Sequence, residues 1–410
     1  MLNPTKETAM QTKPISRRIA LAATAALLAM SGTAHAQAQD IKLGFNGDLS
    51  ASPSAQSGAA GVLGIQAAID DINAAGGVLG RKLTLVIRDD QSQPPKSIQN
   101  MSDLIDNEKV VAVFGPTNSG NAMAWKHIPN QKKIVSMGMI GGGTAITAPL
   151  SAGADNYMFR VSMVDREQVS GLMAFAKKAG YKKLGLLAET TGFGAGGLKD
   201  MQELGKLQDL DVSVVERFAV GDTDMTSQLN KLKSAGVDAV AVWAQGTPTA
   251  QLMRSMEKIN WFPPVLSSWA ADNVTFFDAA GKTLAEKPVF MRTMVDPRTP
   301  QQKALFERTK AKLAAPSAFP FVIHGYDAVQ LIAAAMRQAG STDGEKMRVA
   351  LEDLKQPVQG VMKAYEKPFS KAEHEALTAT DFAFVKWSNG RLTQITDGVA
   401  SQLTPADFKR

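Results

Sequence analysis

The chain has 410 residues, 44% hydrophobic and 20% charged, which is typical of folded globular protein and long enough for two domains. It has no cysteine, which excludes disulfides, thiolate metal sites and a lipid-attachment cysteine. The 45 Lys and Arg only slightly exceed the 39 Asp and Glu, and no basic cluster is interleaved with aromatic residues. We therefore expect no nucleic-acid partner.

The first 36 residues have the pattern of a cleaved secretory signal. Basic residues up to Arg18 precede a twelve-residue apolar run, and the stretch ends in Ala-His-Ala at residues 34–36. A run of this length is too short to span a membrane, which takes about 20 residues. We therefore expect a soluble, exported protein that starts at Gln37 and carries a net charge of about +3.

From residue 41 onward, short apolar runs alternate with amphipathic segments. This alternation predicts βαβ units and parallel sheets in an α/β fold. The first series has predicted strands at residues 41–45, 83–87, 110–114 and 134–137, and helices around 62–72, 95–107 and 121–131.

A second series of the same kind starts after Arg160, which predicts two similar α/β lobes. Its predicted helices are 167–179, 196–207, 225–234 and 247–259, and its strands are 184–188, 212–215, 239–243 and 265–267. A strand at 289–294 follows, then helices at 301–313, 323–339 and 344–354, and a terminal hairpin turned at Asn389-Gly390.

The first candidate site is the turn after the predicted strand 110–114. Gly115 and Pro116 break the strand, and Asn118 or Ser119 can cap the helix that follows. Ligands bind at the carboxyl ends of parallel strands, and the free N–H groups of a helix start attract anions. We interpret Asn118 and Ser119 as carboxylate-binding candidates; the alternative is a helix cap without a ligand.

The next predicted strand runs into a glycine-rich loop at residues 139–144. Such a loop exposes backbone N–H groups and lets a ligand approach closely, although a solvated turn explains the glycines equally well.

Residues suited to catalysis are few. The three histidines after the signal, His127, His324 and His374, are not spaced as a metal pair, and none accompanies a Gly-x-Ser-x-Gly turn. We therefore expect no enzyme, no metal and no cofactor.

One motif favours a different function. Gly192, Gly194 and Gly197 fit the G-x-G-x-x-G pattern of dinucleotide-binding turns, and a strand ending at Glu216 follows. A secreted NAD-dependent oxidoreductase is therefore the alternative from another class, although short motifs of this kind often match by chance. Phe193, at the tip of this loop, could cover a ligand or instead fold onto its own helix.

Several motifs, in order and spacing, together resemble one known family. They are Ile41-Lys-Leu-Gly, Ala67-Ala-Ile-Asp-Asp, Asp89-Asp90, Gly115-Pro-Thr-Asn-Ser-Gly, Phe159-Arg160, Phe193-Gly194, Gly221-Asp-Thr-Asp, Gly236-Val-Asp-Ala-Val and Gly325-Tyr-Asp-Ala-Val. With them, nearly all of the mature chain resembles the periplasmic substrate-binding proteins of ABC importers, in the branch of the branched-chain amino acid (leucine/isoleucine/valine) binding proteins.

The resemblance implies a two-lobed type I periplasmic binding protein fold. Each lobe is then a mainly parallel sheet flanked by helices, and three crossover strands join the lobes. Lobe 1 would comprise residues 37–161 and 293–357, and lobe 2 residues 162–292 and 358–410. The implied location is the periplasm, and the implied partners are a small-molecule ligand and the permease and ATPase subunits of an importer; delivery to a sensor stays open.

The resemblance also implies roles for individual residues. Ser119 would hold a ligand carboxylate, helped by the loop from Ile140 through Gly141 to Gly142, and Phe193 would cover the ligand from the second lobe. This sequence departs from the family near Gly142, where a hydroxyl residue is missing, and at Ser57, where an aromatic residue is expected.

The acid that receives the amino group in amino-acid binders is replaced by Trp269. A buried ammonium without a counter-charge is disfavoured, whereas an indole suits a flat or apolar group. We therefore expect a small organic carboxylate without an α-ammonium, either aromatic or of another kind. The alternatives are an amino acid or amide, with Asp165 as the substitute acid, and a Trp269 that only fills the core.

Overall fold

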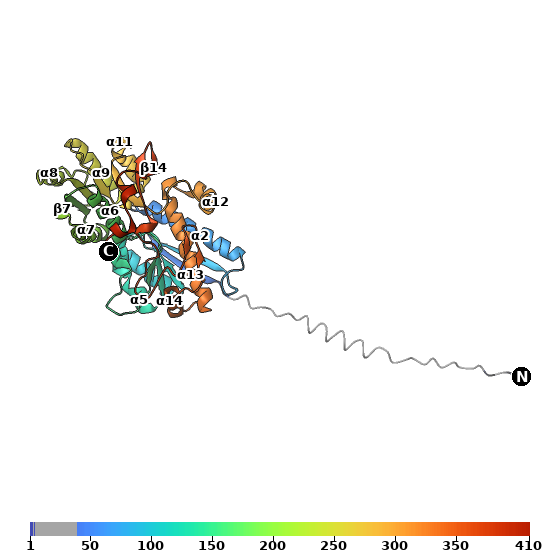
Figure 1. Cartoon of the computed structure of the whole chain (residues 1–410). Helices are drawn as coiled ribbons and strands as arrows, with labels where there is room; N and C mark the ends of the chain where they lie inside the picture. The colour runs from blue at the N-terminus through green and yellow to red at the C-terminus, as the bar shows by residue number, and fades with distance from the viewer. Residues whose placement is uncertain (3, 5–38) are drawn as a thin grey trace. The chain divides into compact units, whose positions relative to one another are not determined.

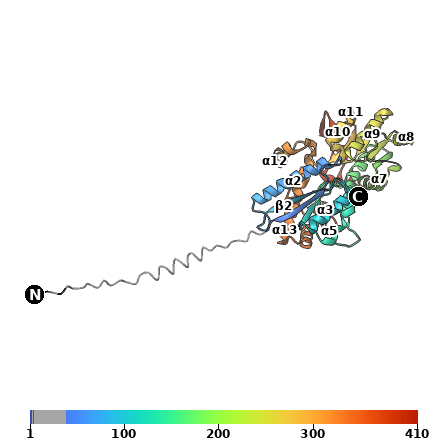
Figure 2. The same ribbon diagram turned by 180° about the vertical axis from the view of Figure 1, so that it is seen from behind.

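The computed structural model describes residues 1, 2, 4 and 39–410. The predicted signal over residues 1–36 thus lies outside the described residues, apart from three of its first four positions. Residues 40–410 form one compact unit, and all that follows concerns this unit (Figures 1 and 2).

The first sheet has five parallel strands in the order β2-β1-β3-β4-β5. In strand β1, which lies next to the edge strand β2, the alternate residues Ile41, Leu43 and Phe45 are apolar and completely buried. The strands are β1 Ile41–Gly47, β2 Leu83–Asp89, β3 Ala112–Phe114, β4 Val135–Gly138 and β5 Met158–Arg160, and the helices between them are α2 Ala55–Ala74, α3 Pro94–Asp106, α4 Ser119–Trp125 and α5 His127–Lys132.

The second sheet has seven strands in the order β14-β13-β10-β9-β8-β6-β7. The five strands from β10 to β7 are parallel, and β13 and β14 add an antiparallel hairpin at one edge. The strands are β6 Lys183–Glu189, β7 Asp211–Phe218, β8 Ala239–Trp243, β9 Val265–Ser267, β10 Pro288–Arg292, β13 Ala383–Ser388 and β14 Arg391–Gln394. The helices are α6 Asp165–Lys178, α7 Gly192–Leu207, α8 Thr226–Ser234, α9 Gly246–Lys258, α10 Val274–Ala280 and α11 Lys282–Ala285.

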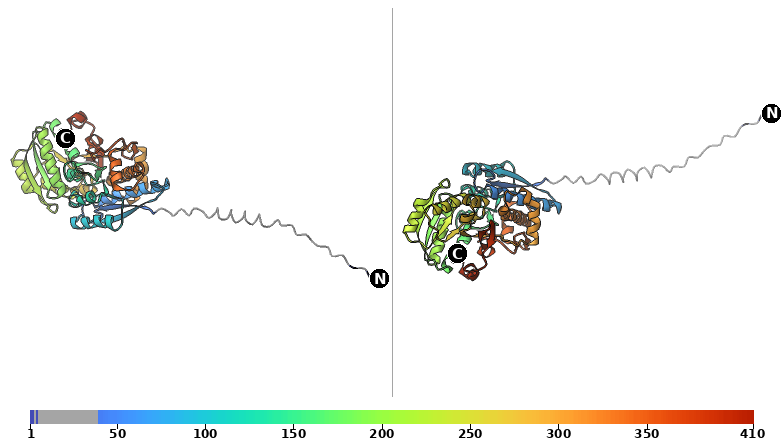
Figure 3. Two further views of the ribbon diagram at one scale, coloured as in Figure 1. Left: turned by 90° about the horizontal axis from the view of Figure 1, so that it is seen from below. Right: turned by 90° about the horizontal axis from the view of Figure 1, so that it is seen from above.

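After β10 the chain returns to the first sheet. It forms α12 Pro300–Thr309, α13 Phe319–Ala339 and α14 Gly344–Glu352, and α13 packs along α2. The two helices approach closely through glycines, because a Cβ on Gly325 would lie 2.2 Å from the carbonyl oxygen of Gly61. Figure 3 accordingly shows the orange α13 segment beside the blue first segment, with the green and yellow segments of the second sheet on the other side.

The chain thus passes between the two sheets three times, after β5, after β10, and between α14 and β13. The last passage includes the short hairpin of β11 Val358–Gln359 and β12 Ala364–Tyr365, which the sequence reading did not predict. Two mainly parallel sheets flanked by helices confirm the predicted fold class.

One helix among the described residues is long and apolar enough to cross a membrane. It is α13 with its preceding turn, Pro316–Ala339, 24 residues with a mean hydropathy of 1.2. Since 83% of its most apolar window is buried inside the protein and it packs on α2, we interpret it as a core helix.

The predicted elements are present with shifted ends. The strand expected from Val110 begins at Ala112, and the helix expected from Asn121 begins two residues earlier, at Ser119. The hairpin turn is confirmed at Asn389-Gly390, where both residues have positive φ, 51° and 74°. The two short helices α10 and α11 were not predicted.

Candidate ligand-binding site

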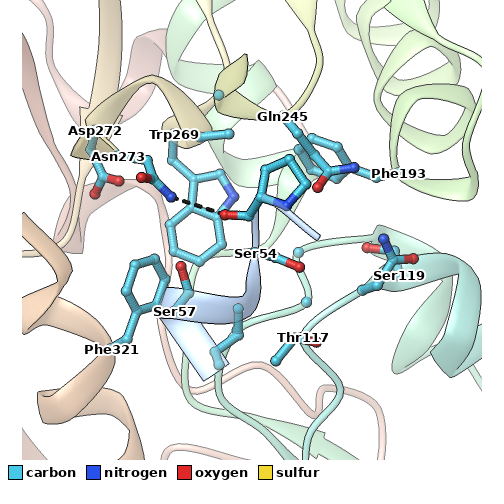
Figure 4. A pocket seen from close by; sticks show the side chains of 17 residues that line it. Ser54, Ser57, Thr117, Ser119, Phe193, Gln245, Trp269, Asp272, Asn273 and Phe321 are labelled. Atoms are coloured by element: carbon cyan, nitrogen blue, oxygen red, sulfur yellow. Dashed lines mark hydrogen bonds between the residues drawn. The ribbon is translucent and has the colours of Figure 1, made fainter. Parts of the chain in front are cut away.

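A cavity with about 550 Å³ of empty space lies where loops from both sheets meet (Figure 4). All of the predicted site residues except Asp165 line it: Asn118, Ser119, Ile140, Gly141, Gly142, Phe193 and Trp269. Residues predicted from strand ends and from the resemblance thus line one cavity, and their role in ligand binding stays a prediction.

Ser119 lies at the start of α4 and faces the glycine-rich loop. Its Oγ accepts a hydrogen bond from the N–H of Gly143 at 3.0 Å, and among the described residues no acceptor takes its hydroxyl proton. Asn118 caps the helix, since its Oδ1 accepts from the N–H of Gly120 at 2.8 Å. Ser119 thus has a proton to donate, whereas the side-chain oxygen of Asn118 is already engaged.

The strand-to-helix turn before Ser119 requires glycine at position 115. Gly115 has φ of +123°, and a Cβ there would lie 2.1 Å from the carbonyl oxygen of Asn46. The close approach of these two loop backbones brings α4 to the edge of the cavity.

Arg160 orients the glycine-rich loop from behind. It is fully buried, and its Nη1 donates to the carbonyl oxygens of Gly141 at 2.8 Å and Gly143 at 3.1 Å, while Glu375 pairs with its Nε and Nη2. In a trans peptide the N–H and C=O point in opposite directions. The N–H of Gly142 therefore points away from Arg160 and is available on the cavity side of the loop.

Asp165 does not line the cavity but supports the same loop. Its backbone N–H donates to the Gly142 carbonyl at 2.7 Å, and a Cβ on Gly142 would lie 2.2 Å from its Oδ1. Complete burial, with the nearby Asp200 carboxylate, raises its pKa well above the usual range. The missing side chain at Gly142, noted as a departure from the family, is thus what makes room for Asp165.

Aromatic side chains form the apolar walls. Trp269 is 7% exposed, and its ring lies 5.0 Å from that of Phe321; Phe193 is 6% exposed, and its ring lies 5.9 Å from that of Trp243. Phe321 comes from α13 and was not predicted. No pattern in the sequence marks it, because it differs from its core neighbours only in where the helix places it.

An acid missed by the sequence reading also lines the cavity. Asp272, three residues after Trp269, is 2% exposed, and its Oδ2 lies 3.5 Å from Nε of Arg292. Burial raises its pKa to about 7, and the Arg292 charge opposes that shift. We predicted that Trp269 replaces the family's acid at one aligned position. The turn Trp269–Asp272 nevertheless brings an acid, Asp272, to the cavity.

Gln245 is another polar lining residue that was not predicted from the sequence. Its backbone N–H donates to Oε2 of Glu189 at 2.8 Å and its Nε2 to Oε1 of Glu189 at 3.3 Å. The buried Glu189 carboxyl, whose pKa burial raises, thereby fixes the Gln245 side chain at the cavity wall.

Contacts within the protein account for the glycines of the G-x-G-x-x-G motif. A Cβ on Gly194 would lie 2.0 Å from the carbonyl oxygen of Glu189, and one on Gly197 would lie 2.0 Å from the Trp243 ring. The glycines therefore allow α7 to pack on its own sheet, which leaves the dinucleotide interpretation without a structural reason.

Two helix-flanked, mainly parallel sheets with a cavity between their loops define a type I periplasmic binding protein. The sequence profile of the family described as "Periplasmic binding protein" matches residues 40–391, and the chain belongs to this family. It is 25% identical over 370 residues to the Leu/Ile/Val-binding protein BraC3 of Rhizobium johnstonii, covering 90% of this chain and 96% of that protein.

Solved structures agree with this fold. A periplasmic binding protein type 1 from Bordetella pertussis matches with a TM-score of 0.77 at 24% identity, covering 87% of this chain and all of that one. A branched-chain amino acid transporter substrate binding protein of Streptococcus pneumoniae, in complex with isoleucine, matches at 0.71, 24% identity, and 86% and 97% coverage. A solute binding protein of an ABC transporter from R. palustris, in complex with 4-hydroxybenzoate, matches at 0.70, 20% identity, and 87% and 96% coverage.

Proposed function

We propose that the protein is the periplasmic, non-catalytic solute receptor of an ABC importer of the branched-chain amino acid type, and that it binds a small organic carboxylate with a flat apolar body. The observation that carries this proposal is the pairing of hydrogen-bond donors at Ser119 and Gly142 with aromatic walls at Phe193, Trp269 and Phe321. Burying one ring between these walls contributes roughly 2 to 4 kcal/mol, at about 25 cal/mol per Å² of apolar area.

The similar proteins support this class and leave the ligand open. Of the two ligand complexes compared above, one holds an aromatic carboxylate and the other an α-amino acid. An amino acid or amide is therefore the second candidate, and the observation in its favour is Asp272, which offers a carboxylate in the cavity.

The proposal extends to domains and partners. Lobe 1 is assigned residues 37–161 and 293–357, lobe 2 residues 162–292 and 358–410, and the closed lobes would present the ligand to permease and ATPase subunits. The two separate sheets support this division. A receptor that serves a sensor has the same lobes, and co-purification with a permease distinguishes the two.

A thermal-shift screen of aromatic acids, aliphatic acids and amino acids tests the ligand class, because a bound ligand raises the melting temperature. We expect aromatic carboxylates to stabilise the protein most. Stabilisation by leucine, isoleucine or valine alone would contradict the proposal and favour the amino-acid candidate. Calorimetric titration with NAD tests the oxidoreductase alternative, for which we expect no binding.

Replacing Ser119 tests the carboxylate contact. We expect Ser119→Ala to weaken benzoate binding by ~1 to 3 kcal/mol, the usual loss for a hydrogen bond to a charged group. Ser234→Ala, at an exposed position on α8, is the matched control. Equal dissociation constants for the two variants in calorimetry would remove Ser119 from the site.

A further inference from the structure

Four polar groups of the cavity that have no partner among the described residues for a donor or acceptor atom differ by position. Those contributed by the first sheet's loops donate: the Ser119 hydroxyl and the Gly142 N–H. Those contributed by the second sheet's loops accept: the Asp272 carboxylate and the side-chain oxygen of Gln245. A ligand that fits both sides therefore needs an acceptor at one end and a donor at the other.

Both acceptors lack a partner. Oδ2 of Asp272 and Oε1 of Gln245 are enclosed by protein, and no described residue donates a hydrogen bond to either. Enclosed polar atoms in native proteins are nearly always hydrogen-bonded, and exceptions call for an explanation such as a missing ligand. Both side chains line the cavity, so a hydrogen-bond donor on a ligand held there would lie beside them.

Arg292 does not fill this role for Asp272. Its Nε lies 3.5 Å from Oδ2, too far for a good hydrogen bond, and its Nη2 donates instead to the carbonyl of Ser317 at 2.7 Å. The guanidinium thus supplies charge that favours an ionised Asp272 and leaves the carboxylate free to accept.

Figure 4 shows how the two kinds of group are arranged. Ser119 and Asp272 lie on opposite sides of the view, with the Trp269 ring and Gln245 between them. A ligand whose carboxylate meets Ser119 would extend along Trp269 toward Asp272. An α-ammonium is attached one carbon from its carboxylate and would stay near Ser119, so a donor that reaches Asp272 belongs at the far end of the ligand.

We propose that Asp272, assisted by Gln245, is a specificity residue that receives a hydrogen-bond donor at the end of the ligand opposite its carboxylate. The ligand class is an aromatic carboxylate that carries a hydroxyl or amino group on its ring. This inference rests on the proposed function, because it takes the carboxylate to bind at Ser119.

Calorimetric titration with matched ligands tests it. The probes are benzoate, its three hydroxy isomers and its three amino isomers, which share the carboxylate and ring but place the donor differently. We expect at least one donor-bearing isomer to bind wild-type protein about tenfold or more tightly than benzoate, the ratio that one added hydrogen bond to a charged group gives.

The same ratio of dissociation constants is then measured in variants. Asp272→Asn keeps the side chain's shape but loses its charge, and we expect the ratio of the two dissociation constants to fall toward 1. If this variant does not fold, because Arg292 is left unpaired, Gln245→Met provides the second variant, with the same expected fall in the ratio. Ser119→Ala should weaken all the probes equally and leave the ratio unchanged.

The outcomes separate the two proposals. Benzoate binding without any gain from a ring donor, or a gain that survives in both variants, would overturn the role of Asp272 and leave the proposed function standing. Binding of α-amino acids and of none of the benzoates would overturn the proposed function and this inference with it.

Discussion

A buried histidine contributes to the dependence of this protein's stability on pH. His324 is completely buried in α13, its Nε2 lies 2.9 Å from the hydroxyl of Thr293, and burial lowers its pKa to about 4. Because the folded pKa lies below the unfolded value near 6.5, the neutral ring stabilises the fold fully above about pH 6.5. That contribution is lost as the pH falls toward 4, by roughly 3 kcal/mol.

We expect His324→Asn to remove the histidine's share, roughly 3 kcal/mol, of the change in unfolding free energy between about pH 6.5 and 4, since asparagine does not titrate. Urea denaturation at several pH values measures this slope. His127→Asn, at an exposed position, is the control and should keep the wild-type slope. A slope in the His324 variant equal to that of wild type would assign the pH response to other groups.

The sequence located residues of the site where a local rule exists. Ser119 and Gly142 follow strand ends, and parallel strands bring their carboxyl ends to one edge, so their neighbourhood could be predicted. Phe321, Gln245 and Asp272 could not, because they come from separate helices and turns that only tertiary packing brings to the cavity. Arg160 was visible only as part of a family motif, and its contact with the loop required coordinates.

In helix α7, two adjacent glycines differ in the space that an added Cβ would find. Gly197 faces the buried Trp243, whereas a Cβ on Gly196 would meet open space. We expect Gly197→Ala to destabilise the protein by ~1 to 3 kcal/mol through overpacking, and Gly196→Ala to stabilise it by up to about 1 kcal/mol through helix propensity. Urea unfolding of the two variants measures both, and similar values would show that Trp243 can move aside.

At the scale of elements, periodicity was a good guide wherever segments were long. The helices of both series were predicted because each buries one face, and the strands because they are continuous apolar runs. In contrast, α10, α11 and the hairpin β11–β12 are too short to show a period. Ends shifted where a cap decided the boundary: Asn118 starts α4 at Ser119 through its side chain, which no apolar spacing marks.

At the scale of the whole molecule, a glycine of α7, beside the second sheet, lies against a glycine of α4, beside the first sheet. We call the two sheets with their helices the two halves. A Cβ on Gly192, at the start of α7, would lie 2.9 Å from the Cα of Gly120 in α4. If the halves close on the ligand as lobes, Gly192→Ala holds them apart, and we expect binding of an aromatic carboxylate to weaken by about tenfold, or ~1.4 kcal/mol.

Two measurements check this expectation. Urea unfolding without ligand should be unchanged in Gly192→Ala, because the substitution opposes closure and not the folding of either half. Small-angle scattering should show a larger radius of gyration for the variant than for wild type at saturating ligand. Unchanged affinity would mean that the contact between α4 and α7 is not part of closure.

The packing of α13 on α2 also sets the order in which the protein can be completed during synthesis. The first sheet ends at Arg160, but the helix that covers α2 is finished only at Ala339, about 180 residues later. At roughly 5 to 20 residues per second, the ribosome needs on the order of 10 to 35 seconds to make that stretch. During this interval the face of α2 that packs on α13 has no partner, although α2 can already pack on the first sheet. The nascent chain is therefore kept from its native state until most of it has been made, which leaves time for a chaperone or an export receptor to engage it first.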